Sequence, residues 1–167
     1  MLQPGAAFPV ANVGDLVQRW RPDYFTINGR SGFYLSHNAP DVVPANYIGE
    51  PTLIRCMNAG LCTHSTHIHG NHVFGLAQGG SNGAVALETN IIERDVWPME
   101  PLARCDLLLP YETPPDIPAF PMTQEPFPLR YVMHCHTEMS QTAAGGNYPQ
   151  GMVTHWDLLG QIGRAHV

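Results

Sequence analysis

The chain carries two segments rich in metal donors, His64-Ser65-Thr66-His67-Ile68-His69-Gly70-Asn71-His72 and, further along, His134-Cys135-His136. The second segment follows a strand-like run at residues 129–133, and the first leads directly into Val73 and Phe74. β-Branched and aromatic residues favour strands, in which successive side chains face opposite sides. We therefore interpret both segments as parts of β-strands that divide their donors between two faces.

Alternation along a strand assigns each donor to one face. One face receives four imidazoles, those of His67, His69, His134 and His136. Cys135 points to the other face, where His64 also lies. If the two segments pair, the sequence predicts two metal sites back to back, joined by the backbone of a single tripeptide.

The two donor sets favour different copper chemistry. Thiolate with imidazole is typical of a copper electron-transfer centre, whereas a surface of imidazoles alone suits copper that binds dioxygen. The covalent route from Cys135 to either neighbouring histidine is short enough to carry electrons from the first site to the second.

Composition predicts a single all-β domain. Hydrophobic residues make up 44% and charged residues 13% of the 167 residues, as in an ordered globular chain with one core. The 16 Gly and 16 Pro residues interrupt helices and favour short strands joined by turns. The predicted fold is a Greek-key β-barrel or sandwich.

Strand-like runs lie at residues 24–27, 52–57, 64–76, 102–109, 129–135 and 152–158. Residues 31–51 are expected to form a loop, because Pro40, Pro44 and Pro51 exclude a central helix. A second, proline-rich loop is expected at residues 110–128. The amphipathic stretch at residues 13–20 is expected to form a short helix.

Several classes of partner are disfavoured by the sequence. The net charge of −6 argues against nucleic acid, whose phosphates attract basic surfaces. The sequence contains no run of about 20 apolar residues, so no membrane span is expected. The first residues, Met1 to Gly5, lack a charged leader followed by an apolar run, and we expect no secretory signal in them.

Both donor segments resemble the copper motifs of one protein family. His64-x-x-His67-x-His69-Gly70 is similar to the first copper motif in the last domain of laccase-like multicopper oxidases. The tripeptide at residues 134–136 is similar to the second motif, and the neighbouring segments 55–60 and 151–153 also fit. The resemblance covers residues 24–158 and implies a cupredoxin (plastocyanin-like) domain of the carboxy-terminal type.

The resemblance implies a role for each donor. Cys135 and His64 correspond to ligands of the mononuclear type 1 copper, and Met152 corresponds to its axial residue. The residues that correspond to half the ligands of a trinuclear type 2/type 3 copper cluster are His67, His69, His134 and His136. In the family, the other half comes from two His-x-His pairs of another domain. The expected partner is therefore a second cupredoxin domain, from the same chain or from another subunit.

The family also implies an activity. The expected reaction is one-electron oxidation of a small reducing substrate, coupled to reduction of dioxygen to water. The catalytic residues implied are His134, Cys135 and His136. Phenols and the ions Cu(I), Mn(II) and Fe(II) remain open as substrates, and a periplasmic or secreted location is expected.

One position departs from the family pattern. A second type 1 histidine usually follows the cysteine by five residues, where this chain has Ser140. His155 is the nearest substitute, although alternation places it on the face opposite Met152, and Met139 is an alternative thioether donor. If the type 1 site is altered or absent, the domain is instead a copper carrier or a remnant without enzymatic activity.

A zinc hydrolase is a rival interpretation from another enzyme class. Residues 67–72 are similar to the His-x-His-x-Asp-His signature of the metallo-β-lactamase fold, with Asn71 in place of the aspartate. That fold needs helices alternating with strands, which this proline-rich sequence does not supply. It also leaves His134-Cys135-His136 unexplained.

The remaining histidines and cysteines are interpreted as structural. His37 and His155 are isolated, and His72 is expected on the His64 side, in a structural or supporting role. The other cysteines, Cys56, Cys62 and Cys105, are expected to be small buried apolar residues. A Cys56–Cys62 bridge is the alternative in an oxidising compartment.

The predicted domain organisation has three parts, and the chain is interpreted as a piece of a longer protein. Residues 1–22 form a linker or entry segment, and residues 23–160 form the cupredoxin domain. Residues 161–167 are interpreted as a non-native tail, because Ile162 to Val167 are similar to the translation of a sequencing adapter. His166 is therefore not counted as a metal ligand.

Overall fold

The computed structural model describes residues 14, 18, 20–114, 126–144 and 146–163. Their strands are β1 Ala45–Ile48, β2 Thr52–Met57, β3 His64–Ile68, β4 Val73–Gly79, β5 Val85–Leu87, β6 Glu93–Arg94, β7 Val96–Met99, β8 Arg104–Leu109, β9 Leu129–Cys135 and β10 Val153–Gln161. The helical elements are α2 Gly32–Asn38 and two 3₁₀ turns, η1 Pro40–Val42 and η2 Glu138–Gln141. The all-β prediction is confirmed.

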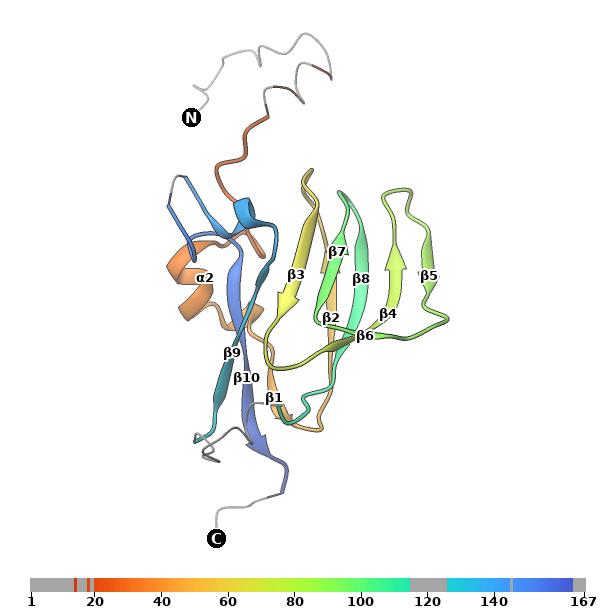
Figure 1. The fold of residues 1–167 in the computed structure, drawn as a ribbon, viewed down its shortest axis with the longest axis vertical. Coiled ribbons are helices and arrows are strands. Elements are labelled where there is room, and N and C mark those ends of the chain that lie inside the picture. Colours follow the sequence, from red (N-terminus) through yellow and green to blue (C-terminus); the bar gives the residue numbers. More distant parts are fainter. Residues whose placement is uncertain (1–13, 15–17, 19, 115–125, 145, 164–167) are drawn as a thin grey trace.

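The strands form two sheets (Figure 1). The first sheet has the order β1-β10-β9-β3-β7, and its pairs are antiparallel except for the parallel pair β1–β10. The second has the order β2-β8-β4-β5, and β6 also pairs with β4. β3 is followed along the chain by β4, so the connection at residues 69–72 crosses from one sheet to the other.

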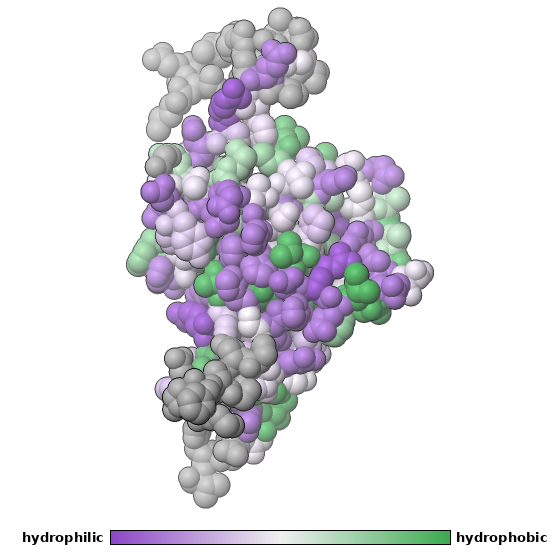
Figure 2. Space-filling view, viewed as in Figure 1, coloured by the Kyte–Doolittle hydropathy of each residue, from purple (hydrophilic) through white to green (hydrophobic). Residues whose placement is uncertain are grey.

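The core lies between the two sheets. In β4 and β8 buried side chains alternate with more exposed ones, as expected for strands with one face against another sheet. The fully buried members of the core include Ile68, Val73, Trp97, Leu107, Leu109, Tyr111, Trp156 and Leu158. The face shown in Figure 2 is mostly polar, with apolar residues in small groups.

The prediction of a continuous loop at residues 31–51 is wrong. Helix α2 occupies residues 32–38 and packs beside β10, and β1 occupies residues 45–48. The prolines lie outside these elements: Pro40 follows the helix end, and Pro44 and Pro51 flank β1. Proline therefore limits the length of each element here but does not prevent its formation.

The prediction of one strand through residues 64–76 is also wrong. Gly70 has a φ of +76°, which ends the strand and lets the chain pass to the second sheet. Residues 24–27 form only an isolated bridge, from Ile27 to Arg30 around the Asn28-Gly29 turn. Pro98 explains why β7 was missed, since proline is tolerated at a sheet edge, where β7 lies.

Other strand predictions agree with the structure. β2 and β9 have the predicted bounds, and β8 and β10 fall within two or three residues of theirs. The proposed helix at residues 13–20 lies almost entirely outside the described residues, as do residues 115–125 of the long loop and His166. Within the described part of the chain, no helix is long and apolar enough to cross a membrane.

Candidate metal centre

The register between β3 and β9 sets the positions of the candidate metal donors. Thr66 pairs with Cys135 and His67 with His134, in antiparallel orientation. Paired residues point to the same side of a sheet, so His67 and His134 share one face. Cys135 points to the other face, the same one as His64. The predicted division of donors between two faces is therefore found in the structure.

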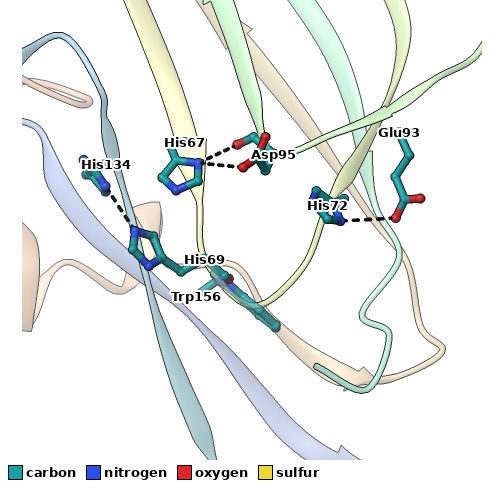
Figure 3. A network of polar contacts seen from close by, with 7 residues as sticks. All are labelled: His67, His69, His72, Glu93, Asp95, His134 and Trp156. Atoms are coloured by element: carbon teal, nitrogen blue, oxygen red, sulfur yellow. Dashed lines mark hydrogen bonds and ion pairs between the residues drawn. The ribbon is translucent and has the colours of Figure 1, made fainter. Parts of the chain in front are cut away.

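The imidazole face brings four histidines together. The Nε2 atoms of His69 and His134 are 3.2 Å apart, and the donor nitrogens of His67, His69 and His134 all lie within 4.8 Å of one another. The ring of His136 lies beside them, with centroid distances of 5.3 Å to His67 and 5.7 Å to His134. Figure 3 shows three of these rings turned toward a common space.

Hydrogen bonds orient two of these rings. His67 Nδ1 donates to the Asp95 carbonyl oxygen at 2.9 Å, with the Asp95 carboxylate 3.7 Å away. His134 Nδ1 donates to the Cys135 carbonyl oxygen at 3.0 Å. Because carbonyls only accept, each Nδ1 carries the proton, and each Nε2 is an acceptor whose lone pair can bind a metal; that of His134 accepts from His69 Nε2 in this structure.

Burial favours the uncharged form of the rings. It lowers the pKa of His69, and the neighbouring His67 and His136 lower it further. Burial likewise lowers the pKa of His134, which outweighs the opposite effect of its hydrogen bond to Cys135. Metals bind neutral imidazole, so these histidines are held in the form that coordinates.

The turn after β3 is fixed by Trp156 and Tyr131, which sequence reasoning did not select, and by Asn71, which it considered only in place of a metal-binding aspartate. The Trp156 indole donates to the His69 carbonyl at 2.8 Å, and the Tyr131 ring stacks on Trp156. Asn71 donates to the carbonyls of Gly70 and Glu112, and its Oδ1 accepts from the Glu112 amide. Both polar atoms of the Asn71 side chain are thus hydrogen-bonded within the fold, which gives it a structural role at the turn.

The opposite face holds a compact group of Cys135, His64 and Ser140. His64 Nδ1 lies 3.5 Å from Cys135 Sγ, and Ser140 Oγ lies 3.1 Å from Sγ and 3.3 Å from Nδ1. All three residues are buried, and the Phe25 ring packs edge-on against His64 at 6.0 Å. A soft sulfur donor, an imidazole nitrogen and a hydroxyl oxygen therefore meet in one buried group, a set that fits copper.

The sequence matches no protein-family model and no curated protein. Solved structures are similar in fold. The blue copper oxidase from Nitrosomonas europaea matches with a TM-score of 0.58 and 22% identity over 81% of this chain. The multicopper oxidase mgLAC matches with a TM-score of 0.59 and 20% identity over 87% of this chain. McoA from the hyperthermophile Aquifex aeolicus matches with a TM-score of 0.52 and 20% identity over 81% of this chain.

The chain has the cupredoxin fold of multicopper oxidases. It spans 35% of the Nitrosomonas europaea protein, 38% of mgLAC and 26% of McoA. The matched region is therefore a minor part of each of those chains. The metallo-β-lactamase alternative does not agree with this cupredoxin fold.

The candidate replacements for the missing type 1 histidine lie elsewhere in the cupredoxin fold. His155 Nδ1 donates to the Ser36 carbonyl at 2.9 Å, and its Nε2 lies 3.7 Å from Asp157. Met139 is exposed. Met152 immediately precedes β10, and its carbonyl accepts from the Cys135 amide at 3.0 Å, so its role as axial residue stays a prediction.

His72 does not lie on the His64 side. Because the chain turns at Gly70, His72 lines the same cavity of about 300 Å³ as His67 and His69. Its ring is exposed and faces Glu93, with Nδ1 and Oε1 3.6 Å apart (Figure 3). Strand alternation cannot be extended through a residue with positive φ, which explains this error.

The cysteines outside the metal centre are free thiols in this cupredoxin domain. Cys105 is buried as predicted, whereas Cys56 and Cys62 are half-buried. Cys56 is paired with Cys105 across β2 and β8, and not with Cys62. A hydrogen bond from Cys105 lowers the pKa of Cys56, and the same bond raises the pKa of the Cys105 thiol.

Cys135 is expected to titrate as an unusually acidic thiol in the metal-free protein. Burial raises its pKa, but hydrogen bonds from His64, Ser140 and the amides of residues 137 and 65 outweigh burial and lower it to about 6. The ultraviolet absorbance of its thiolate should thus appear with a midpoint near pH 6, and be absent in Cys135→Ser.

The same shift predicts a pH-dependent stability. A thiol whose pKa is lower in the folded chain stabilises the fold above its unfolded pKa of 9.0, and this contribution is lost as pH falls through 6. The difference in unfolding free energy between the wild type and Cys135→Ser should therefore grow from pH 6 to pH 9. A thiolate midpoint near 9, or a constant difference, would contradict the prediction.

Proposed function

We propose that this chain is the copper-binding domain of a multicopper oxidase, which couples one-electron oxidation of a small reducing substrate to reduction of dioxygen to water. The observation that carries the proposal is the arrangement around one tripeptide. Cys135 faces a buried thiolate–imidazole pocket, while its neighbours His134 and His136 face the imidazole group on the reverse of the same sheet.

Bound copper would supply one-electron redox chemistry at the Cys135 pocket and dioxygen binding at the imidazole face. Burial of Cys135 and His64 excludes water from the first site. The hydrogen bonds to Asp95 and to the Cys135 carbonyl hold the Nε2 atoms of His67 and His134 toward the second site. The Cys135 carbonyl accepts from His134, so the two sites are connected by a hydrogen bond as well as by the backbone.

The proposed oxidase needs a partner domain. The imidazole face offers four histidines, and its members His69 and His136 remain exposed. We infer that a second cupredoxin domain, from the same chain or another subunit, covers this face and supplies the remaining ligands. This chain spans only 35% and 38% of the first two similar proteins, which supports that inference. A periplasmic or secreted location is part of the same proposal.

A copper carrier without oxidase activity is the second candidate. The observation that favours it is Ser140, which stands where the family pattern has a histidine. A carrier needs to hold copper but does not need rapid exchange of electrons between two sites. The two functions therefore differ in whether copper bound at Cys135 takes part in redox turnover.

The test compares the copper-loaded protein, together with the partner domain that completes the imidazole face, with its Cys135→Ser variant, using visible absorption, electron paramagnetic resonance and dioxygen consumption with a phenol or Cu(I). An intense thiolate-to-copper band and dioxygen consumption, both lost in Cys135→Ser, are the expected results. Copper bound without that band, together with no consumption that depends on Cys135, would reject the oxidase and leave the carrier.

A further inference from the structure

We propose that the hydroxyl of Ser140 is the third protein donor of the mononuclear copper site, beside Cys135 and His64. This inference rests on the proposed function and specifies its electron-entry site. In this chain the site would thus have one imidazole, one thiolate and one hydroxyl, in place of two imidazoles and one thiolate.

The three donor atoms already form a triangle of the right size. Its sides are 3.1 Å from Oγ to Sγ, 3.3 Å from Oγ to Nδ1 and 3.5 Å from Sγ to Nδ1. A point equidistant from all three lies about 1.9 Å from each, slightly less than typical metal–nitrogen and metal–sulfur bonds of about 2.0–2.3 Å. Copper bound here would therefore be held by Cys135, His64 and Ser140 without a large movement of any of the three side chains.

The hydroxyl is oriented to donate a lone pair to the ion. Ser140 Oγ lies 2.8 Å from the Thr137 carbonyl and 3.1 Å from Cys135 Sγ. It has one proton, so it can donate to only one of them at a time. When the thiolate binds a metal, the proton goes to Thr137, and the lone pairs of Oγ are left facing Sγ and Nδ1.

The backbone holds Ser140 in this position. Its side chain is 0% exposed, and its amide donates to the Thr137 carbonyl at 2.9 Å. Its own carbonyl accepts from the Met152 amide at 2.7 Å. Gly151 packs so closely against this carbonyl that a Cβ there would clash with it. The position is fixed from both sides, which is what a metal ligand requires.

The structure provides no second imidazole for this site among the described residues. His155 is bound to Ser36 and lies near Asp157, and His72 lies on the opposite face. An oxygen donor is harder than an imidazole nitrogen and favours Cu(II) over the softer Cu(I). The site should therefore have a lower reduction potential than one with two histidines, which restricts the substrate to stronger reductants.

The test uses Ser140→Ala and Ser140→His with copper as the probe. Ser140→Ala should lower the affinity for the copper that gives the thiolate band by at least about tenfold, as expected for loss of a donor. Pulsed electron paramagnetic resonance of that copper should detect nitrogen from one histidine in the wild type and from two in Ser140→His. Ser140→His should also have the higher reduction potential.

A buried hydroxyl outside the site provides the matched control. Thr154 is buried, and its hydroxyl has no hydrogen-bond partner among the described residues. Thr154→Val should leave the thiolate band and its copper affinity unchanged. This comparison separates loss of a donor from a general effect of removing a buried hydroxyl.

The outcomes separate this inference from the proposed oxidase. If Ser140→Ala keeps the wild-type copper affinity and band, or if the wild type has two histidine nitrogens on that copper, the inference is rejected whatever the dioxygen consumption. If the Ser140 variants behave as expected but the protein with its partner domain consumes no dioxygen, the assignment of Ser140 stands and the oxidase is rejected.

Discussion

Replacing His134 by alanine is expected to lower the copper affinity of the imidazole face by more than about 100-fold. Loss of a residue that only hydrogen-bonds a metal ligand typically lowers metal affinity by about 10–100-fold, and loss of a ligand itself should cost more. His134 Nε2 lies 3.2 Å from His69 Nε2 and belongs to the group whose donor atoms are within 4.8 Å. Its Nδ1 proton is bound by the Cys135 carbonyl, so the free nitrogen has a single orientation.

The measurement is competition for copper with a chelator of known affinity. It is made in the Cys135→Ser background, so that the measured affinity is that of copper bound at the imidazole face. Circular dichroism verifies that each variant is folded. Since His134 is buried, His136→Ala provides a second variant at an exposed histidine of the imidazole face, whose ring centroid lies 5.3 Å from that of His67.

His72→Ala is the matched control. His72 lines the same cavity but faces Glu93, and it lies outside the group of converging donors. Its removal should change copper affinity by less than about threefold, within the ordinary variation of surface substitutions. Equal losses from His72→Ala and His134→Ala would contradict the assignment of the imidazole face.

Gly70→Ala is expected to destabilise the fold by about 2–5 kcal/mol. The positive φ of Gly70 costs any other L-residue about 1–2 kcal/mol. A Cβ at this position would also lie 2.5 Å from the Tyr131 ring, and relieving such an overlap costs a further 1–3 kcal/mol or so. Denaturant unfolding measures the loss.

Gly49→Ala separates the two contributions. Gly49 has a similar φ of +82°, but a Cβ there meets no atom within 4 Å. It should therefore show the backbone cost alone. Gly70→Ala should be the more damaging of the two, and equal losses would show that contact with Tyr131 contributes nothing.

Sequence reasoning placed the candidate donor side chains on the correct faces of the sheet, because strand alternation is strict over short distances; their role as metal ligands stays a prediction. It placed His67 with His134 and Cys135 with His64, and the β3–β9 pairing confirms both. It failed for His72, because the turn at Gly70 interrupts the alternation. A glycine directly after a strand was the available signal for that turn.

The supporting residues could not be found from the sequence. Asp95 and Trp156 act through a backbone carbonyl and an indole that come from distant parts of the chain. Ser140 was noticed only as a missing histidine, since five-residue spacing does not reveal that its hydroxyl turns back toward Sγ. Helix α2 was missed because three prolines were taken to exclude a helix throughout residues 31–51. Proline disfavours helix only at its own position and at the residues next to it, and α2 ends before the first of them.

The pairing of β3 with β9 also limits how the length of this chain can change in evolution. Deleting or inserting one residue within β9 would shift the alternation and move Cys135 to the imidazole face, and the same change within β3 would move His64 or His67 to the wrong face. A change of two residues would restore the faces but displace the donors along the sheet. Changes in length are therefore compatible with both sites only in the connecting segments, such as the turn between β4 and β5, where no donor depends on register.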